Sequence, residues 1–338
     1  MPCVAHYVFL RTRSWRSMSY YRAMKTSHCA QFFLAAVAVA IVGVGCATNP
    51  AAPPPPPRCS LDGCPPATPT PPTYLYLSQG SIYTLPLSNA SAAVRTFSAT
   101  GLGMAFDAAQ RLFVANPADG TVSVFNHPIG SGATPSFVLS TGLAGAYDVA
   151  VDSAGDLFVT GHTLHHFCFF HFCGSFPQNT IKVFTAPVSS SSTASATYAG
   201  ADFRRMQGAA VDSSGNLWAS DSVSLYEFTP PVTGTSTPAL SIAEAGIGIR
   251  FDNAGNMYVC TANGVDVFAP PFGNSMSKAY TINAPAASYV AFDQLNNAYV
   301  TTTNGTVLMF RGGASGATAP LLTMNIPSGA NAGIAIGQ

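Results

Sequence analysis

One pattern of apolar and polar positions recurs along the chain from residue 74 to its end. A short apolar run leads into an aspartate, a turn of small or polar residues and a second apolar run. The copies read "GMAFDAAQRLFVAN", "DVAVDSAGDLFVTG", "GAAVDSSGNLWASD", "GIRFDNAGNMYVCT" and "YVAFDQLNNAYVTT". Short alternating runs bounded by turn residues predict β-strands.

The shared aspartate sets the period of the repeat. It falls at Asp107, Asp152, Asp212, Asp252 and Asp293, with spacings of 45, 60, 40 and 41 residues. A period of roughly 40 to 45 residues with strand-like alternation is typical of β-propellers. We expect each carboxylate to accept backbone N–H groups of the tight turn that it opens.

Two columns of large side chains mark the second and third strands of each repeat. The second strand carries one aromatic residue, and the third strand ends in Phe or Leu. The first column is Tyr76, Phe113, Phe158, Trp218, Tyr258 and Tyr299, and the second is Leu85, Phe125, Phe184, Phe228, Phe268 and Phe310. Burial of such a side chain contributes about 1.5 to 3 kcal/mol, so we interpret both columns as packing between blades.

The repeats predict an all-β fold, a six-bladed β-propeller over residues 74–338. The first repeat lacks its first strand, and residues 333–336 near the C-terminus have the sequence to supply it. The C-terminal strand would then complete the first blade and close the ring. Closure removes the open sheet edges through which β-proteins aggregate.

The phrases "VDSSGNLW" and "FDNAGNMYV" resemble the NHL-repeat and gluconolactonase-like group of six-bladed propellers, and the resemblance spans residues 74–338. It implies that ligands bind on the face with the links between second and third strands. Lactonases of this group hold a divalent cation at the central mouth with acidic and amide side chains. Here only Asp148, helped by Gln207 and Asn331, has a suitable place. The alternative is that Asp148 caps its strand.

Composition and charge exclude one class of partner. Only 8% of the residues are charged, and the formal net charge is zero. Five basic residues and no acidic one precede Cys46, which leaves nine basic and 14 acidic residues after it. A mildly acidic body without a basic stripe argues against nucleic acid. We expect a monomer.

The N-terminal sequence predicts export. Lys25 precedes an apolar run at residues 32–44, which suits a secretory signal and is short for a membrane span. The following "VGVGC" resembles a bacterial lipobox, although Gly43 departs from the usual Leu, Val or Ile. The resemblance implies a lipid on Cys46 and a membrane anchor facing the periplasm or the cell exterior. Plain secretion is the alternative. We therefore assign residues 1–46 to an export segment.

Residues 47–73 are rich in proline and predict a disordered stalk in polyproline II conformation. Cys59 and Cys64 lie within it. Because the chain is expected to be exported and no histidine accompanies them, a small disulfide loop is favoured over metal binding.

One link between second and third strands is long. Most are minimal, such as "QGS" and "NGT", but residues 161–179 include "GHTLHHFCFFHFC". Cys168 and Cys173 flank four residues, so they face each other across a hairpin, and export favours a disulfide. The alternatives are free thiols or a zinc or copper site, and a metal held by histidines alone remains possible beside a disulfide. The histidines are His162, His165, His166 and His171.

The same link would display Phe167, Phe169, Phe170 and Phe172 at its tip. One interpretation is a contact tip for a protein partner, a small apolar ligand or a membrane surface. The other is that these rings fold back over the rim of the propeller. Cys260 is expected to be a small buried thiol without reactivity.

These observations favour a surface-tethered propeller that acts as a binding or protein-interaction scaffold. No Ser-His-Asp arrangement or Gly-rich phosphate motif is present, and no catalytic residue or required cofactor is assigned. The alternative is a metal-dependent, lactonase-like hydrolase with its site at the central mouth.

Overall fold

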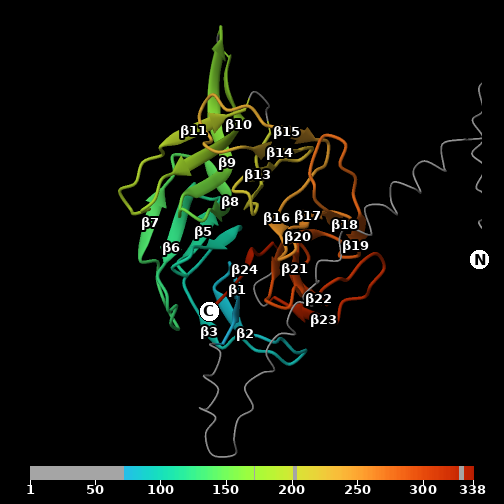
Figure 1. Cartoon of the computed structure of the whole chain (residues 1–338). Helices are drawn as coiled ribbons and strands as arrows, with labels where there is room; N and C mark the ends of the chain where they lie inside the picture. Colours follow the sequence, from blue (N-terminus) through green and yellow to red (C-terminus); the bar gives the residue numbers. More distant parts are fainter. Residues whose placement is uncertain (1–71, 171, 201–203, 327–330) are drawn as a thin grey trace, which may run out of the picture. The chain divides into compact units, whose positions relative to one another are not determined.

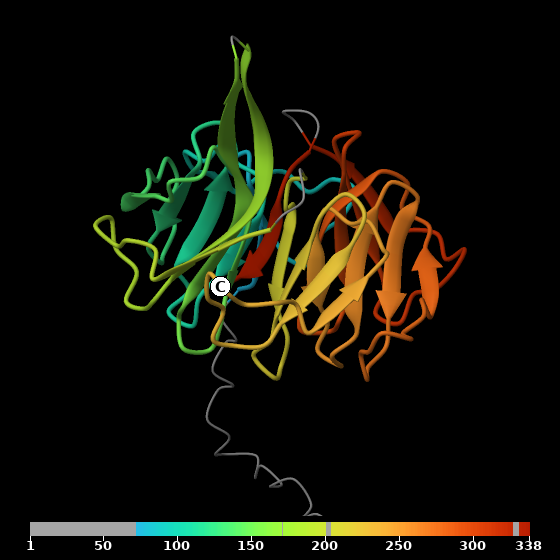
Figure 2. The same ribbon diagram turned by 90° about the horizontal axis from the view of Figure 1, so that it is seen from above.

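A computed structural model of the chain describes residues 72–170, 172–200, 204–326 and 331–338. They belong to a compact unit, Pro69–Gln338. Their strands form six four-stranded antiparallel sheets arranged as blades around a central axis (Figures 1 and 2). No helix capable of spanning a membrane occurs within these ranges. The predicted all-β, six-bladed propeller is confirmed.

Each blade runs from an inner strand near the axis to an outer one. Blade 1 contains β24 (Ile334–Gly337), β1 (Tyr74–Leu77), β2 (Ser81–Thr84) and β3 (Arg95–Thr96). Blade 2 contains β4 (Met104–Phe106), β5 (Leu112–Asn116), β6 (Thr121–Phe125) and β7 (Phe137–Ser140). Blade 3 contains β8 (Gly145–Val151), β9 (Leu157–Phe169), β10 (Phe172–Phe184) and β11 (Ala196–Ala199).

The second half of the ring repeats this order. Blade 4 contains β12 (Gly208–Val211), β13 (Leu217–Ser220), β14 (Leu225–Phe228) and β15 (Leu240–Ile242). Blade 5 contains β16 (Ile249–Phe251), β17 (Met257–Thr261), β18 (Gly264–Phe268) and β19 (Tyr280–Ile282). Blade 6 contains β20 (Ala287–Phe292), β21 (Ala298–Thr302), β22 (Thr306–Phe310) and β23 (Leu322–Asn325).

The two ends of the described chain meet in blade 1. Strand β24 pairs antiparallel with β1, with Tyr74 opposite Gly337. Beyond this pairing, the backbone N–H of Gly333 donates to the hydroxyl of Ser78 at 2.8 Å, and the N–H of Ser78 donates to the carbonyl of Gly333 at 3.0 Å. The prediction that the C-terminus completes the first blade is confirmed.

In blades 4, 5 and 6 the repeated aspartate holds both the turn and the aromatic column. Asp252 Oδ1 accepts the backbone N–H groups of Ala254 and Asn256, at 2.9 and 2.8 Å. Its Oδ2 accepts the hydroxyl of Tyr258 at 3.2 Å. Equivalent bonds to the column run from Trp218 Nε1 to Asp212 and from the Tyr299 hydroxyl to Asp293, both at 3.1 Å. The repeat therefore joins a turn to the core through one carboxylate.

The core lies between neighbouring blades. The aromatic column is buried, and its members contact the next blade in the ring. Trp218 of blade 4, for example, packs edge-to-face against Phe251 and Phe272, with ring centroids 6.3 and 5.2 Å apart. Blade-to-blade packing is the role that the sequence predicted for this column.

Candidate functional site

The long link of blade 3 is a hairpin that stands clear of the propeller (Figure 2). Strands β9 and β10 pair without a break from Leu157 and Phe184 to Phe169 and Phe172. Pairing with β8 ends at His162, and pairing with β11 ends at Thr180. Beyond these residues the hairpin is a two-stranded ribbon.

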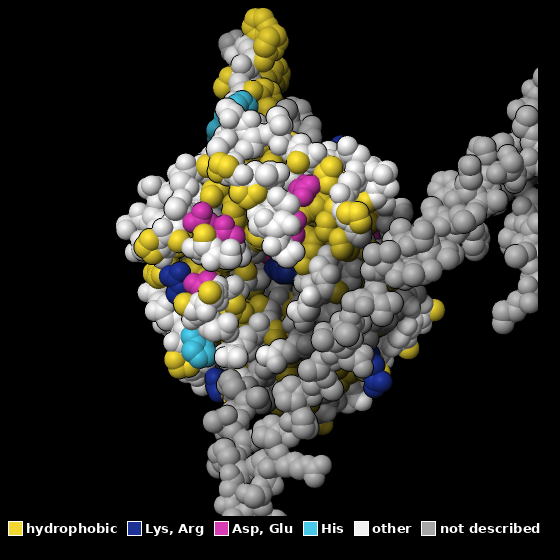
Figure 3. Space-filling view, in the orientation of Figure 1, with side chains coloured by type: hydrophobic (Ala, Val, Ile, Leu, Met, Phe, Trp, Pro, Cys, Tyr) yellow, Lys and Arg dark blue, Asp and Glu magenta, His cyan; other side chains and the backbone are white. Residues whose placement is uncertain are grey.

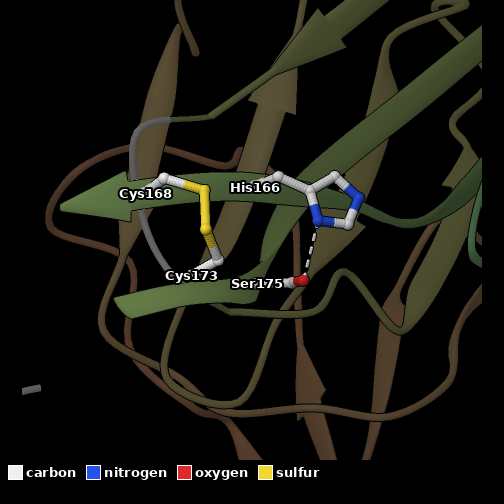
Figure 4. Close-up of a disulfide and its surroundings, with 4 residues drawn as sticks. All are labelled: His166, Cys168, Cys173 and Ser175. Carbon is white, nitrogen blue, oxygen red and sulfur yellow. Dashed lines mark hydrogen bonds between the residues drawn. A yellow bond between two sulfur atoms is a disulfide. The ribbon is translucent and has the colours of Figure 1, made fainter. Parts of the chain in front are cut away.

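A disulfide closes the ribbon near its end. Cys168 and Cys173 lie directly opposite each other, with Cα atoms 4.1 Å apart and an S–S bond of 2.06 Å (Figure 4). The structure thus pairs the two cysteines as the hairpin spacing predicted. Cys46, Cys59 and Cys64 lie outside the described residues.

The described histidines of the hairpin, His162, His165 and His166, contact different neighbours. His166 Nδ1 lies 2.8 Å from the Ser175 hydroxyl, and the ring of His165 packs against Phe176. His162 is buried and stacks on Tyr147, with centroids 5.7 Å apart. His171 lies outside the described residues.

These donors do not fit a metal. Within the described ranges, no group of three or more His, Cys, Asp or Glu side chains could hold an ion. The two cysteines are consumed by their disulfide. Burial, together with the charge of Arg205, lowers the pKa of His162.

The phenylalanines of the tip point into solvent. Phe169, Phe170 and Phe172 are 70, 86 and 81% exposed, and Phe167 is 47% exposed. Figure 3 shows this hydrophobic end beyond the body, with histidine below it. The alternative in which the rings fold back over the rim is wrong, because the ribbon carries them away from the propeller.

Asp148 lies on the axis and is fully buried. Arg250 of blade 5 donates to both of its oxygens, at 3.1 and 3.2 Å, and the backbone N–H groups of Ala209 and Val149 donate at 3.0 and 2.9 Å. A side chain at Gly103 would collide with Asp148 Oδ1, so only glycine permits this approach. With every position of the carboxylate taken by the protein, Asp148 does not fit a divalent cation.

Neither amide helper predicted beside Asp148 is among the groups that donate to its carboxylate. Gln207 lines a separate cavity, and Asn331 Oδ1 is buried with no hydrogen-bond partner within the described ranges. Arg250 also donates to the carbonyls of Met104 and Ala209, at 2.8 and 2.7 Å. Asp148 and Arg250 therefore form a structural ion pair that ties four blades together.

Burial acts on both members of this pair. It raises the pKa of Asp148, against the lowering effect of Arg250. It would lower the pKa of Arg250, but the Asp148 carboxylate outweighs it and the pKa of Arg250 is raised. The guanidinium is therefore charged at any accessible pH.

A cavity of about 380 Å³ opens beside the mouth, between blades 4 and 5. Its polar groups come from separate segments: Glu244 from the link between β15 and β16, Asp266 from β18, and Lys278 from the residues before β19. Lys278 Nζ lies 3.1 Å from Asp266 Oδ1, and the Thr281 hydroxyl donates to the same carboxylate. Gln207 also lines this cavity. The site unites two acids, a lysine and an amide around a space large enough for a small molecule.

Burial raises the pKa of Glu244, and the neighbouring Asp266 raises it further, whereas Lys278 opposes both. A glutamate with a raised pKa is a stronger base when it is ionised, which suits proton transfer from water. Burial also raises the pKa of the Cys260 thiol, which lines the same cavity and stays protonated. Cys260 is therefore no nucleophile, as expected from the sequence.

Sequence reasoning missed this site, although weak signals were present. Glu244 is one of only two glutamates in the chain. Asp266 is an acid in the middle of a third strand, where Ser123 and Leu308 stand in other blades. Arg250 had a clear signal, because it occupies the crowded inner strand where the other repeats carry alanine.

Comparisons with known proteins place the chain by its fold. No family model matches it, and no curated protein matches it. Among solved structures it is similar to the periplasmic gluconolactonase of Pseudomonas aeruginosa, with a TM-score of 0.50 and 15% identity over 76% of this chain and 84% of the other. A gluconolactonase of Xanthomonas campestris gives a TM-score of 0.45 and 17% identity over 67% and 76%. The allergen Mala s 1 of Malassezia sympodialis gives 0.41 and 12% over 63% and 76%.

The likeness to the Pseudomonas aeruginosa structure bears out the resemblance to gluconolactonase-like propellers at the level of the fold. It also corrects the main functional prediction. A binding or protein-interaction scaffold was expected, but the periplasmic protein with the same fold is a gluconolactonase.

Proposed function

We propose that this propeller hydrolyses a lactone or a related cyclic ester in the cavity beside its mouth, with Glu244 as general base. The observation that carries the proposal is the meeting of Glu244, whose pKa is raised, with Lys278 in one cavity. The likeness to a gluconolactonase suggests the class of substrate. In this proposal the chemistry is assigned to these side chains alone.

The reaction needs one proton carrier and one positive charge. The Glu244 carboxylate takes a proton from water as the water oxygen bonds to the lactone carbonyl carbon. The developing oxyanion is stabilised by the Lys278 ammonium, which has three donors and gives one to Asp266. When the ring C–O bond breaks, Glu244 returns the proton to the leaving oxygen, and a hydroxy acid is released.

Asp266 is a positioning residue in this scheme. Thr281 and Lys278 hold its carboxylate in place, and its charge keeps the pKa of Glu244 high. Gln207 offers an amide to hydroxyl groups of a substrate. Activity should rise with pH through the raised pKa of Glu244, because only the ionised form accepts the proton.

The test compares the two glutamates of the chain. Hydrolysis of gluconolactone and of aliphatic lactones is followed by acid release with the full chain. Glu244→Gln should lower kcat/KM by roughly 10² to 10⁴, whereas Glu227→Gln, on β14 and outside the cavity lining, should not. Asp266→Asn should move the acidic limb of the pH profile to lower pH. Parent-like activity of Glu244→Gln, or a chelator that abolishes the parent's turnover, would overturn the proposal.

We also propose that the protein is exported and held at a membrane through lipid on Cys46. The support is the apolar run at residues 32–44 and the "VGVGC" sequence. Cys46→Ser should release the protein from the membrane fraction and remove the lipid detected by mass spectrometry. A variant that stays in the membrane fraction, with an unlipidated parent, contradicts the anchor.

A further inference from the structure

The end of the β9–β10 hairpin holds three large apolar side chains in water. Phe169, Phe170 and Phe172 are mostly exposed, and the rings of Phe169 and Phe170 pack edge-to-face against each other, with centroids 4.6 Å apart. Phe170 has a backbone φ of 54°, in the left-handed region that disfavours bulky side chains. Such an outlier, kept at the tip of a disulfide-closed turn, points to a function for the exposed ring.

The lack of charged side chains on the hairpin indicates which kind of partner it can bind. Residues 157–181 contain no Asp, Glu, Lys or Arg. Protein interfaces concentrate their energy in Trp, Tyr and Arg anchors, and charged pairs fix their register; this tip has neither. Below the phenylalanines lie uncharged polar side chains, among them His166 and Ser175. An apolar end above a polar collar is the arrangement of segments that sit at a membrane–water interface.

The backbone limits how deep the tip can go. Past His162 on β9 and Thr180 on β10, neither outer edge of the ribbon pairs with another described strand. Unpaired backbone groups are costly in hydrocarbon, so only the last residues can leave the aqueous phase. The seven residues after His162 extend the ribbon by about 23 Å at ~3.3 Å per residue. The propeller and its cavity would stay in water.

The sequence before residue 72 brings a lipid surface within reach. It contains the apolar run at residues 32–44 and Cys46, both expected to place the chain at a membrane. Residues 47–73 would span about 80 Å in polyproline II conformation, at ~3.1 Å per residue. A tethered propeller could then turn its hairpin toward the same membrane.

We infer that the disulfide-closed tip of the β9–β10 hairpin is a membrane contact that places Phe169, Phe170 and Phe172 in the headgroup region of a lipid bilayer. The inference is independent of the hydrolase chemistry, which lies between blades 4 and 5. The disulfide keeps the turn closed, so less conformational freedom is lost on insertion.

The test uses the segment Pro69–Gln338, which contains all six blades and the closing strand but lacks the apolar run. Flotation with phosphatidylcholine vesicles should carry the segment upward. Phe169→Ser with Phe170→Ser should weaken binding at least tenfold. The matched control is Leu295→Ser with Leu321→Ser, two exposed leucines away from the hairpin, and it should bind like the parent.

A second measurement follows the tip directly. Phe170→Trp should shift its fluorescence to the blue with vesicles, and lipids brominated near the headgroup should quench it. Trp218 is fully buried and provides a constant background. Thermal melting checks that each variant is folded.

Three outcomes would overturn the inference: no flotation at millimolar lipid, equal binding by the double serine variant, or a lipid-free dimer that the double serine variant abolishes. The last would assign the tip to a second copy of the chain.

Discussion

Asp148 and Glu244 each meet a basic side chain in the same propeller, one on the axis and one in the cavity beside the mouth. Burial raises the pKa of both carboxyl groups. The Asp148 carboxylate accepts hydrogen bonds from Arg250 and from two backbone N–H groups, which occupy both of its oxygens. Glu244 lines open space, and the nearby Lys278 is 43% exposed and bonds to Asp266 instead.

The difference separates a structural charge pair from a reactive one. Both places have an acid and a base, but Asp148 and Arg250 come from inner strands, whereas Asp266 and Lys278 come from the outer half of blade 5. The role of each pair depends on whether protein groups already occupy every hydrogen-bonding position of the carboxylate. Where it does, as at Asp148, the pair joins blades and leaves no room for a ligand. Where it does not, a proton can move to and from water or a substrate.

Breaking the axial pair, the ion pair of Asp148 and Arg250, should have the largest effect on stability. Arg250→Met leaves the Asp148 carboxylate buried without its partner, which costs about 3 to 5 kcal/mol of unfolding free energy. The comparison variant Lys278→Met removes the partly exposed partner of Asp266 and should cost less than about 1 kcal/mol. Urea unfolding of both variants measures the contrast. Equal losses would show that the two pairs are not different in kind.

Removing both charges of the axial pair should recover stability. In Asp148→Asn with Arg250→Met no buried charge remains, and replacement of a buried pair is often close to neutral. We expect this double variant to unfold at higher urea than Arg250→Met alone. A double variant less stable than the single one would mean that the carbonyl bonds of Arg250, not its charge, hold the blades.

A third carboxylate, Asp252, has a pKa shifted in the opposite direction, so its contribution to stability should depend on pH in the opposite way. Burial would raise its pKa, but hydrogen bonds from Asn256, Asn296 and Ala254 outweigh burial and lower it below 3.8. A depressed pKa contributes stability above the unfolded value, and this stability is lost as the pH falls through the folded value. Asp252→Asn should cost about 1 to 3 kcal/mol at pH 7. The difference from the parent should shrink toward pH 3 in unfolding experiments at each pH.

The smallest effect on the free energy of unfolding should come from substitution of Glu244. Its pKa is raised, so its contribution to stability is present below the unfolded value near 4.5 and is lost as the pH rises through the folded value. Glu244→Gln should therefore be slightly more stable than the parent at pH 8. We expect a gain of less than about 1 kcal/mol in the free energy of unfolding, because solvent screens the group. The gain should vanish at pH 4. A destabilised variant at pH 8 would assign Glu244 a structural role.

Sequence reasoning reached the blades because the repeat carries its own evidence. The aspartate turns and the aromatic column recur in one chain, and each copy supports the others. The disulfide was also predictable, because Cys168 and Cys173 are close in sequence. The ion pair of Asp148 and Arg250 could have been predicted from the sequence, because each is a charged residue in a repeat segment that forms an inner strand.

The cavity could not be read in the same way. Glu244, Asp266 and Lys278 come from three segments, and their meeting depends on how blade 5 packs beside blade 4. No local period marks them. The exposure of the tip was likewise open, because an apolar hairpin sequence is compatible with rings packed on the rim or held in solvent.

The pairing of β24 with β1 has a consequence for biosynthesis. Tyr74 finds its partner, Gly337, only after the blades between them have been made. Until then, the inner edge of blade 1 stays open while later blades are added, and such open edges are prone to wrong pairing. Pairings between residues so far apart in sequence are slow to form. Strand β24 is therefore the last element to join the ring. A product truncated before β24 would keep an open edge on blade 1, which a quality-control protease or chaperone can recognise.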